Sequence, residues 1–204
     1  MDDEWATSHE AFAEAADWFV RTTTEVGDRW GDPGLGEWDV RALVGHTSRS
    51  LLTVESYLAA PAERVEVDST AAYYRATSAL AGGSAVAERG RQAGAALGDD
   101  PAAAVAVIAG RVVPVVAGCT GAEVVTTIAG GMRLSDYLPT RTFELVVHTA
   151  DLAAALGLAS DVPALPASQA LALASELAVQ SGRAATLLLA VTGRQGLPPD
   201  FSVL

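Results

Sequence analysis

Four polar side chains follow one another at helical spacing in a segment that is otherwise apolar. They are Arg141, Glu144, His148 and Asp151, each three or four residues from the next. On a helix, residues at this spacing share one face, with neighbouring β-carbons roughly 5–6 Å apart. Glu144 and His148 could therefore ligate one metal ion together. A polar stripe of this kind is costly to bury unless its members pair with each other or bind something.

A third candidate ligand lies much earlier in the chain. His46 stands among apolar residues, and Gly45 beside it leaves room for another group. If its helix faces the helix of Glu144 and His148, the three side chains form a set of two histidines and one glutamate. Three such ligands leave an open position on zinc, which is the pattern of catalytic sites. The same set could hold iron, nickel or another divalent ion, because affinity alone does not select the metal.

The same residues also fit a role without metal. Arg141 with Glu144, and His148 with Asp151, would form ion pairs on an exposed helix face, each worth roughly 0.2–0.5 kcal/mol. A lone histidine on an apolar helix, such as His46, is more often a core residue than a ligand. The four tryptophans are interpreted as packing residues and not as a ligand cage. They are Trp5, Trp18, Trp30 and Trp38.

Helices must position these side chains, because apolar residues recur at helical period along most of the chain. Residues 31–36 interrupt the pattern with glycines and a proline and are predicted to form a loop. The predicted helices cover residues 4–27, 40–60, 69–97, 101–118, 135–157, 167–180 and 182–192.

Local signals define several boundaries of these elements. Asp39 is a good N-cap, and the third helix should break near Gly82-Gly83. Ser135 is predicted to cap the helix that begins at 135, with Pro139 tolerated because it would lie in the first turn. The β-branched run from 124 and the glycines that follow it predict a hairpin over 124–134, the only sheet expected.

Composition restricts the class of protein. The chain has 204 residues, 41 of them alanine, and a formal charge of −12; all 13 basic residues are arginine. Such a composition favours helices, and it argues against a nucleic-acid groove or an anionic membrane surface as partner, since both require a basic face. Cys119 is the single cysteine, and the first residues are acidic. With no secretion signal and no apolar run of about 20 residues, a cytoplasmic location is expected.

Three segments resemble the mycothiol-dependent maleylpyruvate isomerase family, within the DinB-like metal-binding four-helix bundles. They are W-D-V-R-A-L-V-G-H at 38–46, G-G-M-R-L-S-D-Y-L at 130–138 and R-T-F-E-L-V-V-H-T-A-D-L at 141–152. The resemblance implies that His46, Glu144 and His148 hold the metal. It assigns no role to Arg141 and Asp151, which are candidates for cofactor binding or for supporting the metal ligands.

The resemblance implies a mainly all-α, DinB-like bundle over residues 1–157 with a small hairpin. Residues 158–204 are expected to form a short helical extension packed on the bundle, where longer members carry an α/β domain. In that extension, Arg183 and Arg194 could serve an anionic substrate or could be surface residues. A homodimer is possible, because an exposed apolar helix face would permit one.

The implied activity is that of a metal-dependent enzyme. It would use zinc and a small thiol, mycothiol, as S-transferase or cis-trans isomerase on a small electrophile. The alternatives are a bundle that binds metal or ligand without turnover, and a bundle without metal.

Overall fold

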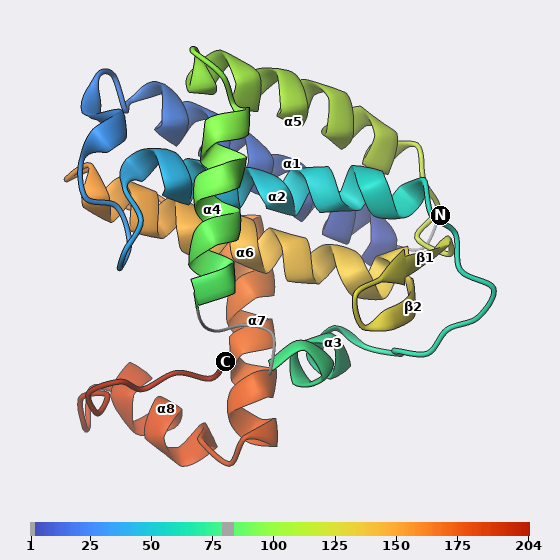
Figure 1. The fold of residues 1–204 in the computed structure, drawn as a ribbon. Coiled ribbons are helices and arrows are strands. Elements are labelled where there is room, and N and C mark those ends of the chain that lie inside the picture. The colour runs from blue at the N-terminus through green and yellow to red at the C-terminus, as the bar shows by residue number, and fades with distance from the viewer. Residues whose placement is uncertain (1–2, 79–83) are drawn as a thin grey trace.

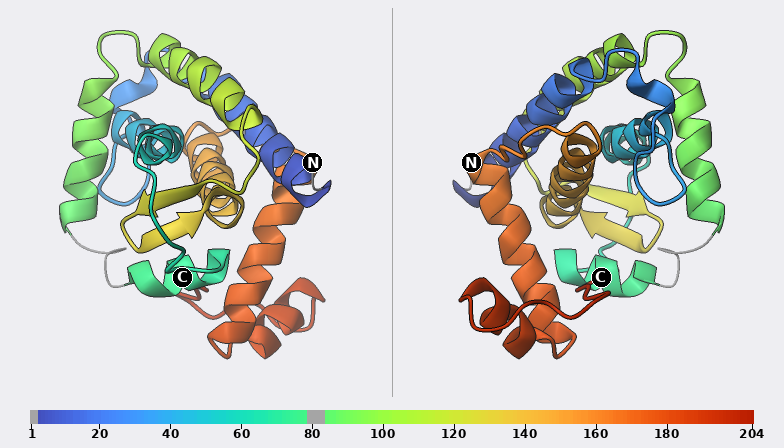
Figure 2. Two further views of the ribbon diagram at one scale, coloured as in Figure 1. Left: turned by 90° about the vertical axis from the view of Figure 1, so that its right-hand side faces the viewer. Right: turned by 90° about the vertical axis from the view of Figure 1, so that its left-hand side faces the viewer.

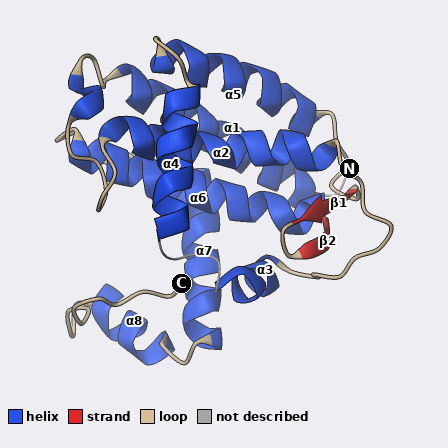
Figure 3. Ribbon diagram, in the orientation of Figure 1, coloured by secondary structure: helices blue, strands red, loops and turns tan. Residues whose placement is uncertain are grey.

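The structure is a computed structural model that describes residues 3–78 and 84–204. Helices dominate it, and the described strands form a single antiparallel pair (Figure 1, Figure 3). The helices are α1 (Asp3–Thr24), α2 (Val40–Leu58), α3 (Thr70–Thr77), α4 (Ser84–Ala96), α5 (Pro101–Ala117), α6 (Leu134–Ala155), α7 (Ala164–Gln180) and α8 (Ala184–Val191), with a 3-10 turn η1 (Arg29–Gly31). The strands are β1 (Val124–Thr127) and β2 (Gly130–Arg133).

Helices α1, α2, α5 and α6 form a four-helix bundle, in which α1 and α2 each pack against both α5 and α6. Large apolar side chains are fully enclosed between them, including Phe12, Phe19, Leu43 and Leu51. Figure 2 shows α4 and α7 on opposite sides of this bundle. The mainly helical fold with a small hairpin that the sequence predicts is therefore confirmed.

The hairpin leads directly into α6, with Val124 opposite Arg133 and Thr127 opposite Gly130. The prediction that Ser135 caps α6 is wrong, because α6 begins at Leu134 and its N-cap residue Arg133 makes no side-chain capping bond. The first amides of α6 donate to backbone carbonyls at residues 123 and 121, in the loop between α5 and β1. These bonds attach the first residues of α6 to the loop that precedes the hairpin.

Three further predictions need correction. Pro139 lies in the second turn of α6, where it removes one backbone hydrogen bond that the helix would make to Ser135. The predicted helix over 69–97 is two helices, α3 and α4, and the break expected near Gly82-Gly83 lies outside the described residues. Helix α7 begins three residues earlier than predicted, at Ala164.

The C-terminal helices extend from one side of the bundle. Helix α7 packs against α1, α3 and α6, and α8 packs against α7. Arg183 donates a hydrogen bond to the carbonyl oxygen of Ser202, and Arg194 is exposed beyond α8. In the described part of the chain no single helix has the length and apolarity of a membrane span, although residues 85–96 and 101–117, bent by 95°, meet the criterion as a pair.

Candidate metal centre

The structure brings His46, Glu144 and His148 together. His46 projects from α2, and the other two project from neighbouring turns of α6. One potential ligand atom from each residue lies within 4.8 Å of those of the other two. The imidazole rings of His46 and His148 stand edge to face, with centroids 4.8 Å apart. The packing of α2 against α6 therefore produces a three-donor cluster from residues that are distant in sequence.

Hydrogen bonds fix the orientation of the two donors on α6. Nε2 of His148 lies 3.2 Å from a carboxylate oxygen of Glu144, and Nδ1 of the same ring lies 3.1 Å from Asp151. The hydroxyl of Tyr74 on α3 donates to the other carboxylate oxygen of Glu144 at 2.9 Å. One nitrogen of His148 and one oxygen of Glu144 thus face the cluster, while their outer atoms are held by Asp151 and Tyr74.

Trp38 covers His46, the donor on α2. Its ring packs on that of His46, with centroids 4.4 Å apart, and its indole nitrogen donates to the carbonyl oxygen of Ala87 on α4. Gly90 on α4 makes this approach possible, since a β-carbon there would lie 2.6 Å from the Trp38 ring. Helix α4 therefore presses the indole against His46 and shields that side of the cluster from water.

The protonation states differ among the three donors. Burial and the nearby His148 lower the pKa of His46 to about 4. Burial acts to raise the pKa of Glu144, but the hydrogen bond from His148 and the charge of Arg141 outweigh it and lower the pKa to about 2. Burial acts to lower the pKa of His148, but hydrogen bonds to Asp151 and Glu144 raise it to about 9. His46 thus offers a neutral imidazole and Glu144 a carboxylate, which are the forms that bind metals.

The donor set fits a divalent metal. His46 Nδ1 is buried and has no hydrogen-bond partner among the described residues, which is uncommon for a ring nitrogen inside a protein. His148 has the arrangement usual for zinc ligands, in which a carboxylate holds the ring nitrogen that does not face the metal. Two imidazoles and one carboxylate leave an exchangeable position.

One family model matches most of the chain. The mycothiol maleylpyruvate isomerase N-terminal domain matches residues 10–153, which include all three donors, all of α2 and α5, and most of α1 and α6. The chain belongs to this family. Searches of curated proteins and of solved structures found no match. The family resemblance predicted from the three sequence segments is thereby confirmed.

Asp151 and Arg141, the two further candidates, lie in different surroundings. Asp151 contacts His148, which supports a role in orienting that ring. Among the described residues no ion pair joins Arg141 to Glu144, so the exposed pair that the spacing allowed does not form. The guanidinium carbon of Arg141 instead lies 5.5 Å and 5.1 Å from the ring centroids of Tyr73 and Tyr137. Arg141 thus forms cation–π contacts one turn from Glu144.

Sequence reasoning misses two residues of the site. Tyr74 lies on α3, 70 residues before Glu144 in the sequence. Nothing in its local pattern indicates that it contacts a carboxylate. Trp38 is predicted to be a packing residue; it does pack, but against His46. A local signal for the contact of Trp38 with His46 does exist. Trp38 lies just before α2, the helix that carries His46, in the same sequence segment.

Asp151→Asn tests the orienting role. An asparagine keeps the size of the side chain but loses the charge that favours the Nδ1–H tautomer of His148, so we expect zinc affinity to fall about 10- to 100-fold with little change in stability. Competition with a chromophoric chelator measures this loss. Asp17→Asn, on the exposed face of α1, is the control for removing one negative charge. Equal zinc affinity in wild type and Asp151→Asn would contradict the orienting role.

Proposed function

We propose that this chain is a zinc-dependent enzyme that transfers or uses a small thiol, with mycothiol as the thiol and a small electrophile as the second substrate. The observation that carries the proposal is the cluster of His46, Glu144 and His148, whose donor atoms converge within 4.8 Å. Membership in the mycothiol maleylpyruvate isomerase N-terminal domain family supports the choice of thiol.

His46, Glu144 and His148 would hold the metal. When bound, zinc supplies a Lewis-acidic position at which a thiol loses its proton near neutral pH. The side chains around it have separate tasks. Asp151 keeps Nε2 of His148 directed at the cluster, and Tyr74 holds one oxygen of Glu144 so that the other stays directed inward.

The surroundings also favour a reactive thiolate. Trp38 covers His46 and limits access of water, which strengthens electrostatic interactions inside the site. Arg141 adds a positive charge one turn from Glu144, and this charge favours an anion nearby. A thiolate so formed can add to an activated double bond and leave again, which gives isomerisation, or it can displace a leaving group and stay attached, which gives transfer.

The experiment follows conjugation of mycothiol to 1-chloro-2,4-dinitrobenzene by the zinc-loaded protein. In this reaction a C–S bond forms, the C–Cl bond breaks, and chloride and the thiol proton are released. We expect the wild type to accelerate thioether formation and Glu144→Gln to lose at least about 100-fold of that acceleration, because a neutral amide is a poor zinc ligand.

Two controls sharpen this test. Glu176→Gln changes an exposed carboxylate on α7, outside the cluster, and should keep the full rate. A cis-configured unsaturated ketone tested in parallel separates the two activities, because isomerisation returns the thiol unchanged. A zinc-loaded protein that accelerates neither reaction with mycothiol would overturn the enzyme proposal in favour of a binding module without turnover.

A further inference from the structure

Two arginines beside the candidate metal centre have no acidic partner. Arg49 on α2 and Arg141 on α6 are half-buried, and no carboxylate of residues 3–78 and 84–204 forms an ion pair with either. A half-buried guanidinium is usually paired, because its desolvation is otherwise costly. The chain has 25 acidic residues for 13 arginines, so the lack of a partner at these two positions leaves their charge available to a ligand.

The guanidinium nitrogens are available for hydrogen bonds as well. Arg141 donates through Nε to the hydroxyl of Thr140, and the described part of the chain supplies no acceptor for its other two nitrogens or for the side chain of Arg49. Some unpartnered polar atoms of the described residues are fully enclosed, but none of them belongs to either arginine, so these nitrogens keep contact with solvent. The neighbouring ligand side chains are also partly exposed, Glu144 to 21% and His148 to 15%. A small molecule can therefore reach both the arginines and the metal ligands.

The packing of α2 on α6 places the two arginines opposite each other. The helices lie side by side and antiparallel (Figure 1): their histidine ligands meet at one level, and the hydroxyl of Tyr137 donates to that of Thr53 at another, over 3.1 Å. Arg49 lies one turn from Thr53 towards the metal ligands, and Arg141 lies one turn from Tyr137 in the same direction. Side chains one turn apart leave the same face of a helix, so both arginines lie between the Thr53–Tyr137 hydrogen bond and the metal ligands.

The electrostatics of His46 agrees with this placement. Burial is the main cause of its lowered pKa, and the positive charges of Arg49 and Arg141 both contribute to it. Each guanidinium thus lies close enough for its charge to act at the candidate metal centre. The rings of Tyr73 and Tyr137, at 5.5 Å and 5.1 Å, hold the guanidinium of Arg141 in place without neutralising its charge.

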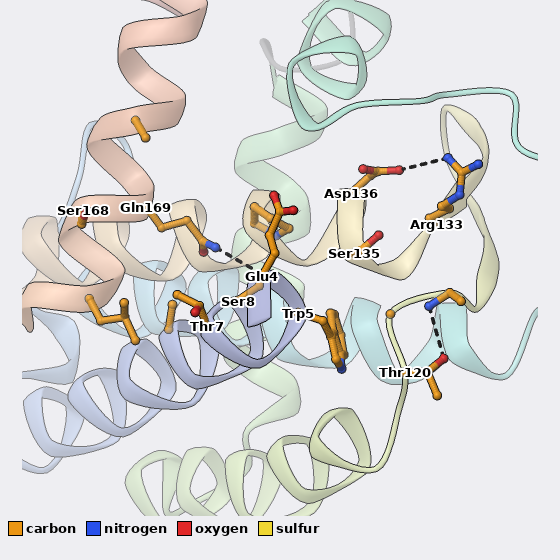
Figure 4. Close-up of a pocket in the computed structure, with 16 residues that line it drawn as sticks. Glu4, Trp5, Thr7, Ser8, Thr120, Arg133, Ser135, Asp136, Ser168 and Gln169 are labelled. Atoms are coloured by element: carbon orange, nitrogen blue, oxygen red, sulfur yellow. Dashed lines mark hydrogen bonds and ion pairs between the residues drawn. The ribbon is translucent and has the colours of Figure 1, made fainter. Parts of the chain in front are cut away.

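The cleft between α1, the start of α6 and α7 differs from this arrangement (Figure 4). Its wall includes Arg133, but a nitrogen of this arginine lies 3.7 Å from a carboxylate oxygen of Asp136, with which it forms an ion pair. Glu4 adds a second carboxylate to the same wall. An anion in this cleft would meet a net negative charge, whereas an anion between Arg49 and Arg141 would meet two unpaired positive charges.

We propose that Arg49 and Arg141 determine substrate specificity by binding a carboxylate of the electrophile and holding that substrate beside the metal centre. A guanidinium pairs with a carboxylate through two parallel hydrogen bonds, which fixes both the position and the orientation of the anion. The formal charge of −12 repels anions from the chain as a whole, so a local pair of cations is needed to admit one. The proposal rests on the proposed function for the identity of the ligand as a substrate, but the anion site itself does not depend on turnover.

Two electrophiles that differ in charge test the proposal: 4-chloro-3-nitrobenzoate and the neutral 4-chloro-3-nitrobenzamide. We expect the zinc-loaded protein to bind the benzoate at least tenfold more tightly than the benzamide in ligand-observed NMR titrations without thiol. Arg49→Gln and Arg141→Gln should each weaken benzoate binding at least tenfold and leave benzamide binding unchanged. Arg49→Lys keeps the charge but not the planar fork, and it should retain part of the benzoate affinity.

Controls separate this site from general charge attraction and from coordination to zinc. Arg194→Gln removes an exposed arginine beyond α8 and should leave benzoate binding unchanged. The zinc content of every arginine variant should equal that of the wild type. Equal binding of the two probes, or equal loss in Arg49→Gln and Arg194→Gln, would overturn the proposal. Benzoate binding that persists in both Arg49→Gln and Arg141→Gln would overturn it too, because the carboxylate would then bind zinc alone.

The same two probes separate this proposal from the proposed function. With mycothiol as thiol, either probe can form a C–S bond and lose chloride and the thiol proton. Loss of benzoate binding in the arginine variants, with no thioether formed by the wild type, would support the anion site and overturn the enzyme. Thioether formation by a wild type that binds both probes equally would support the enzyme and overturn the anion site.

Discussion

Replacing His46 or His148 by alanine is expected to abolish stoichiometric metal binding while the bundle stays folded. The wild type should carry about one equivalent of divalent metal, because three converging donors with an open position are typical of zinc sites. Each substitution leaves two donors, and we expect an affinity loss larger than the roughly 10- to 100-fold that follows from losing an outer partner. Elemental analysis of untagged, zinc-reconstituted protein measures the content.

The chain offers a matched control for this experiment. His9 is the only other histidine and lies on α1 beside Trp5, 5.8 Å between ring centroids. His9→Ala should keep the full metal content. Circular dichroism should show the same helix content in all three variants, because His46 and His148 are only partly buried and the core residues around them are unchanged. Equal metal content in wild type and in both folded site variants would contradict the assigned ligands.

Gly45→Ala is expected to destabilise the protein strongly. A β-carbon at this position would lie 2.1 Å from the backbone nitrogen of Gly94, so α2 and α4 would have to separate. A clash with backbone cannot be relieved by a change of rotamer, and we expect a loss of about 3 kcal/mol, at the upper end of the usual effect of overpacking. For a domain of this size such a loss lowers the Tm by roughly 6–12 °C.

A second glycine provides the comparison. Gly110 lies within α5, and a β-carbon there would meet no atom within 4 Å. Gly110→Ala should therefore stabilise the protein by about 0.5–1 kcal/mol, since alanine loses less backbone entropy in a helix. Thermal unfolding followed by circular dichroism gives both values. A Gly45→Ala protein as stable as the wild type would show that the close approach of α2 and α4 is not required.

The consequences of Gly45→Ala should extend to the metal centre. Helix α4 also holds Trp38, through the hydrogen bond to Ala87 and the close contact at Gly90. When α4 moves, Trp38 loses this support and uncovers His46. The glycine beside His46 leaves room for another group, as the sequence suggests, and the structure shows that this group is the backbone of α4.

Local sequence patterns predict most of the elements and the candidate ligands. Spacing placed Glu144 and His148 on one helical face, because a helix brings residues four apart together whatever surrounds it. The hairpin followed from β-branched residues beside glycines, and the family followed from three segments. These signals are local, so they can be recognised without knowledge of the packing.

The surroundings of those candidate ligands depend on how the helices pack. Tyr74 donates a hydrogen bond to Glu144 because α3 packs on α6. Trp38 packs on His46 and is held there by its hydrogen bond to α4. Helix α6 begins at Leu134, before the predicted Ser135 cap, and its first two amides donate to carbonyls of the loop between α5 and β1, a contact that local propensity cannot foresee. The same holds for Arg141. Its spacing suggested an ion pair with Glu144, whereas in the structure its guanidinium contacts the rings of Tyr73 and Tyr137. Residue types and spacing indicate the candidate ligands, whereas their surroundings depend on long-range packing that no local pattern encodes.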